Sequence, residues 1–132
     1  MKQIMLVKTW IVQILVHLPA LIITGCSVYL SSQSVLRIPM HAFWNADKVI
    51  HLFSFAGLAG SWTLWFPPKS WKANPVRNAL ICIIGVAVYG ALDEFHQSFT
   101  PGREVSVFDW MADVAGAVLG TGAGAFLWRR LK

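Results

Sequence analysis

Five of the six acidic residues of this sequence lie in one stretch that runs from Asp93 to Asp113, and the sixth is Asp47. Long apolar runs flank this stretch, and a Pro101-Gly102 turn interrupts it. Charged side chains beside apolar runs are costly unless they face a polar interior or a wet cavity. The carboxylates are therefore not a solubilising coat, and we expect them to form a site.

The polar residues of this set recur at helical spacing. Three pairs lie four positions apart, namely Asp47 with His51, Asp93 with Gln97, and Asp109 with Asp113. Residues at that spacing share one face of a helix. Glu94 lies three positions before Gln97 and therefore close to the same face. The spacing predicts three separate helices, each with one polar face near its end.

Three kinds of chemistry suit such a cluster. Clustered carboxylates raise one another's proton affinity, and a histidine titrates near neutral pH, so general acid–base catalysis is one. Carboxylate oxygens together with His51 would also bind a divalent metal, and the sequence leaves the presence of a cofactor open. In the third, Lys48 and Arg103 reach the phosphate of a polar headgroup while the carboxylates accept its protons.

We assign the candidate residues to two roles. The catalytic candidates are Asp93, Glu94, His51, Asp109 and Asp113. The substrate-binding candidates are Asp47, Lys48, Gln97, Arg103 and Ser106. The competing interpretation is a charge-paired polar plug, in which Asp47 or Asp109 caps a helix N-terminus. In that case Lys48 and Arg103 would only neutralise the remaining carboxylates.

The composition predicts where these helices lie. Of 132 residues, 56% are hydrophobic and only 13% are charged, and the apolar residues come in runs. Four ranges of about 20 residues, 10–30, 47–66, 76–99 and 107–128, are long enough to cross a hydrocarbon layer of roughly 30 Å. We therefore expect one all-α domain over residues 1–132, a polytopic membrane protein with a four-transmembrane-helix bundle. Basic residues at helix ends account for the net charge of +5, so no nucleic-acid partner is expected.

The basic residues also predict the orientation. Eight of the eleven fall on the side that holds both termini, namely Lys2, Lys8, Lys69, Lys72, Arg77, Arg129, Arg130 and Lys132. Loops rich in lysine and arginine stay in the cytoplasm, so both termini are expected there. The polar helix ends then meet at the outer face of the membrane.

Gly116, Gly120 and Gly124 form a ridge of small residues in the last range. Such a ridge permits close helix packing, either inside the chain or in a homodimer. The two cysteines, Cys26 and Cys82, would lie near opposite faces of the membrane and could not form a disulfide. The segment ending at Cys26 also resembles a lipoprotein cleavage box, but three further predicted spans argue against processing there.

An ordered set of motifs resembles the VanZ-like family of small membrane proteins. The motifs are Ser31-Ser32-Gln33, Asp47-Lys48-x-x-His51, Asp93-Glu94-x-x-Gln97-x-Phe99-x-Pro101-Gly102-Arg103, Ser106-x-x-Asp109 and Asp113-x-x-Gly116. The resemblance covers the chain from about the first span to Gly120. The family's pattern admits Asn or Asp at position 113, and an asparagine could not act as an acid or base.

The resemblance implies a multi-pass protein of the bacterial inner membrane with a role near cell-wall or envelope-lipid metabolism. The family takes its name from a protein associated with resistance to glycopeptide antibiotics, teicoplanin in particular. We expect the site to act on or bind a membrane lipid or a lipid-linked envelope precursor. An enzyme is the first hypothesis, because carboxylates below the interface cost more than headgroup recognition requires. A non-catalytic binder of an envelope lipid or antibiotic target is the second, and a small transporter is the third.

Overall fold

The structure is a computed structural model that describes residues 2–34 and 46–130, with side chains from residue 11 onward. Its elements are α1 (Lys2–Ser31), α2 (Ala46–Trp62), the 3-10 helix η1 (Thr63–Trp65), α3 (Pro68–Ala73), α4 (Pro75–Gln97) and α5 (Val107–Arg130). These two ranges contain no strand, which confirms the prediction of an all-α fold.

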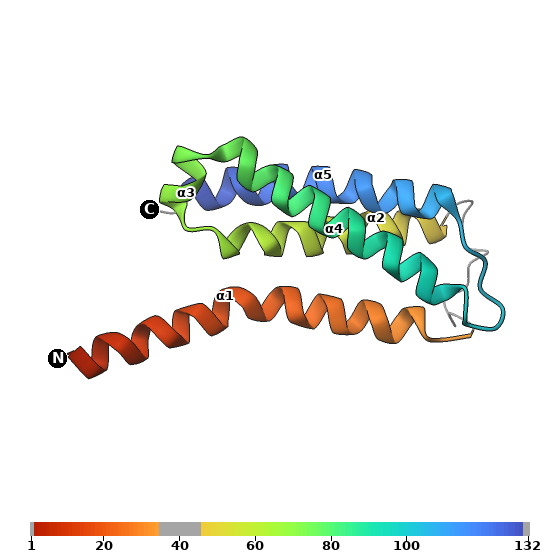
Figure 1. Ribbon diagram of the computed structural model, residues 1–132, viewed down its shortest axis with the longest axis horizontal. Coiled ribbons are helices and arrows are strands. Elements are labelled where there is room, and N and C mark those ends of the chain that lie inside the picture. The colour runs from red at the N-terminus through yellow and green to blue at the C-terminus, as the bar shows by residue number, and fades with distance from the viewer. Residues whose placement is uncertain (1, 35–45, 131–132) are drawn as a thin grey trace.

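The long helices lie side by side along one axis (Figure 1). Helices α2, α4 and α5 form a compact group, and α1 runs along one side of it, in contact with α2 and α4. The N-terminus, α3 and the C-terminal end of α5 lie at one end of the bundle (Figure 1). The beginnings of α2 and α5 and the loop after α4 lie at the other end. The three polar helix ends predicted from the sequence therefore share one end of the molecule.

Three helical segments are long and apolar enough to cross a membrane, namely Ile11–Ser31, Pro75–Gln97 and Val107–Arg130. Their outward faces expose large apolar side chains, such as Leu21 on α1 and Leu119 on α5. Such faces suit a surrounding of lipid, so the prediction of a membrane protein is confirmed. The fourth predicted range, 47–66, holds α2 with 17 residues and η1 with 3, a shorter helical stretch than the other three.

Prolines and one glycine set the ends of the helices. Phe66 is extended and Pro67 follows it, so the helical stretch from Ala46 stops there. Pro68 and Pro75 occupy the first positions of α3 and α4, where a missing N–H costs nothing. Gly102 has a positive φ of 81° in the turn between α4 and α5, a backbone conformation that favours glycine.

The core of the bundle lies along α2. Phe55, Leu58 and Ala59 of α2 are buried against Val86 of α4 and Ala117 of α5. Ala20 of α1 joins the same cluster from the other side. The two cysteines are free, as the sequence predicted, and the structure places Cys26 at the surface and Cys82 in the interior. Helix α2 is thus the element on which the other three long helices converge.

The glycine ridge of α5 faces α2 inside the same chain. A Cβ atom at Gly116 would meet the backbone of Leu52, and one at Gly120 would meet the backbone of Ala56. At Gly124 it would meet the side chain of Thr63. The ridge therefore lets the two backbones approach closely. A homodimer through these glycines is untested by a single chain and stays a prediction.

Substitution of Gly120 tests this packing. We expect Gly120→Ala to lower the free energy of unfolding by about 1–3 kcal/mol, because its new methyl group would overlap the Ala56 backbone. Gly122→Ala is the matched control on the same helix, because no atom lies within 4 Å of its Cβ position. Thermal unfolding in detergent, followed by circular dichroism, measures both variants. Equal stability of the two would contradict the assignment of the ridge.

Candidate functional site

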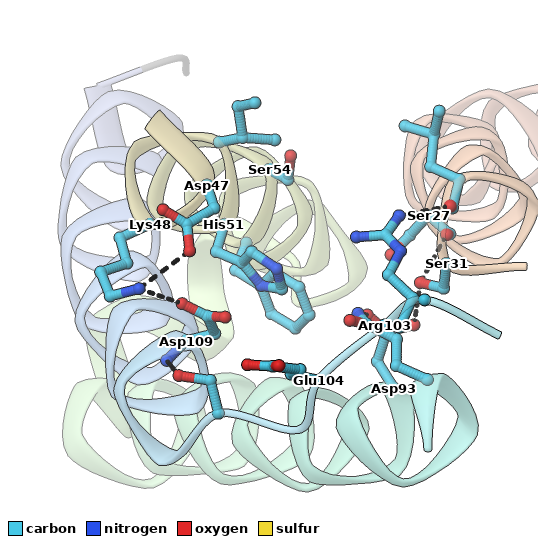
Figure 2. A pocket seen from close by; sticks show the side chains of 16 residues that line it. Ser27, Ser31, Asp47, Lys48, His51, Ser54, Asp93, Arg103, Glu104 and Asp109 are labelled. Carbon is cyan, nitrogen blue, oxygen red and sulfur yellow. Dashed lines mark hydrogen bonds and ion pairs between the residues drawn. The ribbon is translucent and has the colours of Figure 1, made fainter. Parts of the chain in front are cut away.

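The polar helix ends surround a cavity of about 400 Å³ at one end of the bundle (Figure 2). Residues from α1, α2, α4, the α4–α5 loop and α5 line it. Its charged lining residues are Asp47, Lys48, Asp93, Arg103, Glu104 and Asp109. His51 and Ser106 also line the cavity, and they contact Asp113 and Glu94, respectively. The structure thus brings the predicted carboxylates from three helices to one place.

Lys48 joins the beginnings of α2 and α5. Its ammonium nitrogen lies 2.8 Å from Asp47 Oδ2 and 3.0 Å from Asp109 Oδ1. The Lys48 and Asp47 side chains are each about one-third exposed, whereas Asp109 is buried. Ion pairs at such positions contribute little stability. Part of the polar cluster is therefore charge-paired, as the polar-plug interpretation expects.

His51 and Asp113 form the most deeply buried pair. His51 Nδ1 lies 2.8 Å from Asp113 Oδ1, and the Asp113 side chain is fully buried. An ionised carboxylate only accepts hydrogen bonds, so Nδ1 donates to Asp113, and in the neutral imidazole the lone pair is then on Nε2. Asp113 Oδ2 has no hydrogen-bond partner among the described residues. Asp113 thus occupies one ring nitrogen of His51, and the other ring nitrogen is available to a ligand.

Gly90 makes room for this pair, and sequence reasoning did not single it out. A Cβ atom at Gly90 would lie 2.9 Å from Asp113 Oδ2 and 3.1 Å from its Cβ. Its signal in the sequence is weak, since a lone glycine in an apolar helix has many explanations. Only the packing of α4 on α5 shows that Gly90 accommodates the Asp113 carboxylate.

Glu94 is held by one oxygen only. The backbone N–H of Ser106 donates to Glu94 Oε2 at 2.9 Å. Its other oxygen, Oε1, is buried and has no hydrogen-bond partner within the described ranges. The Ser106 hydroxyl accepts from the Asp109 N–H at 3.3 Å and so caps α5. Ser106 is thus the cap, which frees the Asp109 carboxylate from that task.

Asp93 and Gln97 serve a different purpose in the structure. Ser31 Oγ on α1 donates to Asp93 Oδ1 at 2.5 Å, and Gln97 Nε2 donates to Asp93 Oδ2 at 3.0 Å. Both oxygens of Asp93 are therefore occupied. Thr100 Oγ1 also donates to the Ser31 carbonyl at 3.2 Å. This network fastens the end of α1 to the end of α4.

Arg103 supports the same junction. Its Nη2 donates to the Leu30 carbonyl at 2.9 Å and its Nε to the Gln33 carbonyl at 3.2 Å. These carbonyls at the end of α1 are free to accept because the helix stops there. The guanidinium group also lines the cavity, so its remaining N–H groups can reach a ligand (Figure 2).

Three side chains in the site have the arrangement of metal ligands. His51, Glu94 and Asp109 each offer one ligand atom, and these atoms lie within 4.8 Å of one another. The three residues come from three different helices, α2, α4 and α5. Two of them, Glu94 and Asp109, are buried. This trio is distinct from the Asp93 network, whose oxygens are already occupied.

The charges of the site do not balance. All six acidic residues of the chain line the cavity or lie against its wall. Only two basic side chains of the described segments, Lys48 and Arg103, line it. Six carboxylates and two cations give a formal charge of −4, at one end of a chain whose net charge is +5. Such an excess in a partly buried site favours a bound cation or protonated carboxylates.

A scan against protein-family models matches the VanZ/LLP1 family over residues 4–129. The match covers nearly the whole chain, so the protein belongs to this family, as the motifs predicted. Searches of curated proteins and of solved structures found no match.

The hydrogen bonds between the end of α1 and the end of α4 lead to a direct prediction. We expect Ser31→Ala to destabilise the protein by about 1–3 kcal/mol, because it removes a hydrogen bond to a buried carboxylate. The neighbouring Ser32→Ala is the control, because its hydroxyl is exposed and the change should stay within about 0.5 kcal/mol. Thermal unfolding of both variants in detergent measures the difference. A Ser31→Ala variant as stable as the wild type would contradict the role of Asp93 as an anchor.

Proposed function

We propose that this member of the VanZ/LLP1 family is an integral membrane enzyme that acts on a lipid-linked envelope substrate from the outer face of the inner membrane. The observation that carries the proposal is a single cavity with an acidic interior and an apolar wall at one end of a membrane-embedded bundle. Both the shape of the cavity and its chemistry support an amphiphilic substrate.

The membrane topology of the proposal has four spans, with α2 and η1 as the second. Helix α2 runs alongside the three segments that are long enough to span, and its core residues are buried among them. Its short length is explained by the cavity at its beginning, where water can take the place of lipid. The three basic regions, the start of α1, α3 with its flanks and the end of α5, gather at the other end (Figure 1). The positive-inside rule assigns that end to the cytoplasm.

The lining of the cavity supports a substrate with an apolar tail. Ser27 of α1 lies across the cavity from Ser54 of α2 (Figure 2), and the apolar residues Leu30 of α1 and Ile50 of α2 also line the cavity. The buried carboxylates, those of Asp93, Glu94, Asp109 and Asp113, belong to α4 and α5. A polar head can therefore lie among the charged groups while an apolar chain leaves between α1 and α2. Sites for small ligands commonly combine an apolar wall with a few polar groups that fix orientation.

The side-chain atoms that lack a hydrogen-bond partner are the reactive candidates. His51 Nε2, Glu94 Oε1 and one oxygen of Asp109 supply acid–base or metal-ligand groups at the base of the cavity. The guanidinium of Arg103 is already placed by α1 and would hold an anionic group such as a phosphate. The lipid-linked precursors of the cell wall carry such groups, which connects the proposal to the role near cell-wall or envelope-lipid metabolism that the family resemblance implies.

A transporter agrees less well with the arrangement. The acidic side chains gather at one end of the bundle, and apolar residues such as Leu58 and Val86 form its core. A continuous path for a polar solute would need polar groups along the whole length of the bundle. The remaining alternative is a binder without chemistry, which the second of the two experiments below separates from an enzyme.

The topology has its own test. We expect a fluorescent protein fused after Lys132 to be bright in intact cells, because the C-terminus would be cytoplasmic. A cysteine placed at the exposed position Glu104, in a variant without Cys26 and Cys82, should react with a membrane-impermeant maleimide added to intact cells. The reverse pattern at both positions would overturn the orientation, and exposure of both positions on one side would overturn the four-span count.

The enzymatic role is tested with Glu94→Gln. We expect this variant to fold and to retain a lipid substrate from an envelope extract, but to convert it at least about 100-fold more slowly, because one reactive carboxylate is lost. Native mass spectrometry of detergent-purified protein shows which lipid each form retains and whether its mass changes with time. Glu104→Gln is the matched control, with the same change of charge at an exposed position of the same cavity. Equal conversion by wild type and Glu94→Gln would exclude the catalytic role, and retention without conversion by both would identify a binder.

A further inference from the structure

His51 contacts Asp113 and lies close to two further carboxylates, those of Glu94 and Asp109. Asp113 accepts the Nδ1 hydrogen at 2.8 Å and fixes the ring, so the free lone pair is on Nε2. Ligand atoms of His51, Glu94 and Asp109 lie within 4.8 Å of one another. Ligand atoms around a tetrahedral ion lie about 3.4 Å apart, given metal–ligand distances of about 2.1 Å. Small side-chain rotations would bring the three atoms to that spacing.

Glu94 provides an independent indication of a ligand. Its side chain is only 4% exposed, yet Oε1 has no hydrogen-bond partner in the described part of the chain. The Ser106 N–H donates to the other oxygen, Oε2, at 2.9 Å, so only one of the two carboxylate oxygens has a protein partner. A buried carboxylate oxygen without a partner is costly, and a cation at this point would remove the cost.

The charge around the trio favours the same occupant. The site carries six carboxylates against Lys48 and Arg103 among the described residues, a formal charge of −4. Lys48 does not take the position between the three ligands. It contacts Asp109 Oδ1 from the side of Asp47, away from the His51 ring (Figure 2). The second oxygen of Asp109 is therefore available.

We propose that His51 Nε2, Glu94 and Asp109 bind one divalent transition-metal ion of the Zn²⁺ or Mn²⁺ type, with Asp113 as the residue that positions His51. One imidazole and two carboxylates suit such ions, whereas Ca²⁺ and Mg²⁺ take oxygen ligands. A histidine that ligates a metal through one nitrogen usually donates its other N–H to a carboxylate, as His51 does to Asp113.

A tetrahedral ion bound by these three residues would have one coordination position that the protein does not fill. Zinc sites with three protein ligands keep a fourth position for water or substrate, and such an ion polarises the oxygen bound there. The proposal that a metal binds is argued from these residues alone. Only the action of that metal on a substrate rests on the proposed function.

The metal is tested on the full-length protein in detergent without any lipid. After removal of metals with a chelator, Zn²⁺, Mn²⁺, Mg²⁺ or Ca²⁺ is added alone, and bound metal per chain is measured by plasma mass spectrometry after desalting. We expect one Zn²⁺ or Mn²⁺ per chain, with no retention of Mg²⁺ or Ca²⁺. Titration with Co²⁺ should give visible absorption bands that Zn²⁺ abolishes. Absence of a stoichiometric transition metal in the wild type would overturn the proposal, whatever the outcome of the lipid experiment.

Variants then assign the ligands. We expect His51→Gln, Glu94→Gln and Asp109→Asn each to weaken the metal more than about 100-fold. Asp113→Asn should weaken it only about 10-fold, since its role is to orient His51. His96→Gln and Glu104→Gln are controls outside the trio and should bind metal as the wild type does. Circular dichroism identifies any variant that does not fold, and the Co²⁺ bands of the wild type test the site independently of all variants. Equal loss in Glu104→Gln and Glu94→Gln would overturn the assignment.

Discussion

Close contact between the backbones of α2 and α5 sets the geometry of the rest of the molecule. The two helices run in the same direction (Figure 1), and Leu52 lies against Gly116 as Ala56 lies against Gly120, an offset of 64 residues in both cases. The ion pair of Lys48 with Asp109 and the hydrogen bond of His51 with Asp113 have offsets of 61 and 62. One interface of small residues therefore continues, turn by turn, into the buried site.

The attachment of α1 follows another principle. Along most of its length α1 exposes apolar side chains, and only 6% of the most apolar stretch within Ile11–Ser31 is buried. Its end is fixed by hydrogen bonds from Ser31 to Asp93 and from Arg103 to the last carbonyls of α1. Where both sides of a helix are apolar and lipid competes with protein, directional polar contacts decide its position. The wall of the cavity that faces α2 is built by this helix, so the same contacts that hold α1 also shape the site.

The sequence predicted the class of the fold and the convergence of the polar residues, because both follow from patterns along single helices. Hydropathy located the helices, and spacings of four residues placed His51 with Asp47 and Asp113 with Asp109 on common faces. What it could not predict are the partners across helices. The pairing of His51 with Asp113, and not with Asp47, depends on the register of α2 on α5. Gly90 and the cap at Ser106 are likewise visible only once three helices are in place.

The occupancy of individual oxygen atoms separates the two purposes of this acidic cluster. Asp93 has both oxygens bonded, to Ser31 and Gln97, and so acts within the protein as a structural link. Glu94 is its neighbour in sequence and equally buried, yet it keeps one oxygen without a partner. Burial of an unsatisfied carboxylate destabilises a fold, so a stable protein that contains one must gain a ligand, a proton or a substrate there. In this cluster the atoms of His51, Glu94 and Asp113 that lack a hydrogen-bond partner therefore indicate function. The number of charges alone does not.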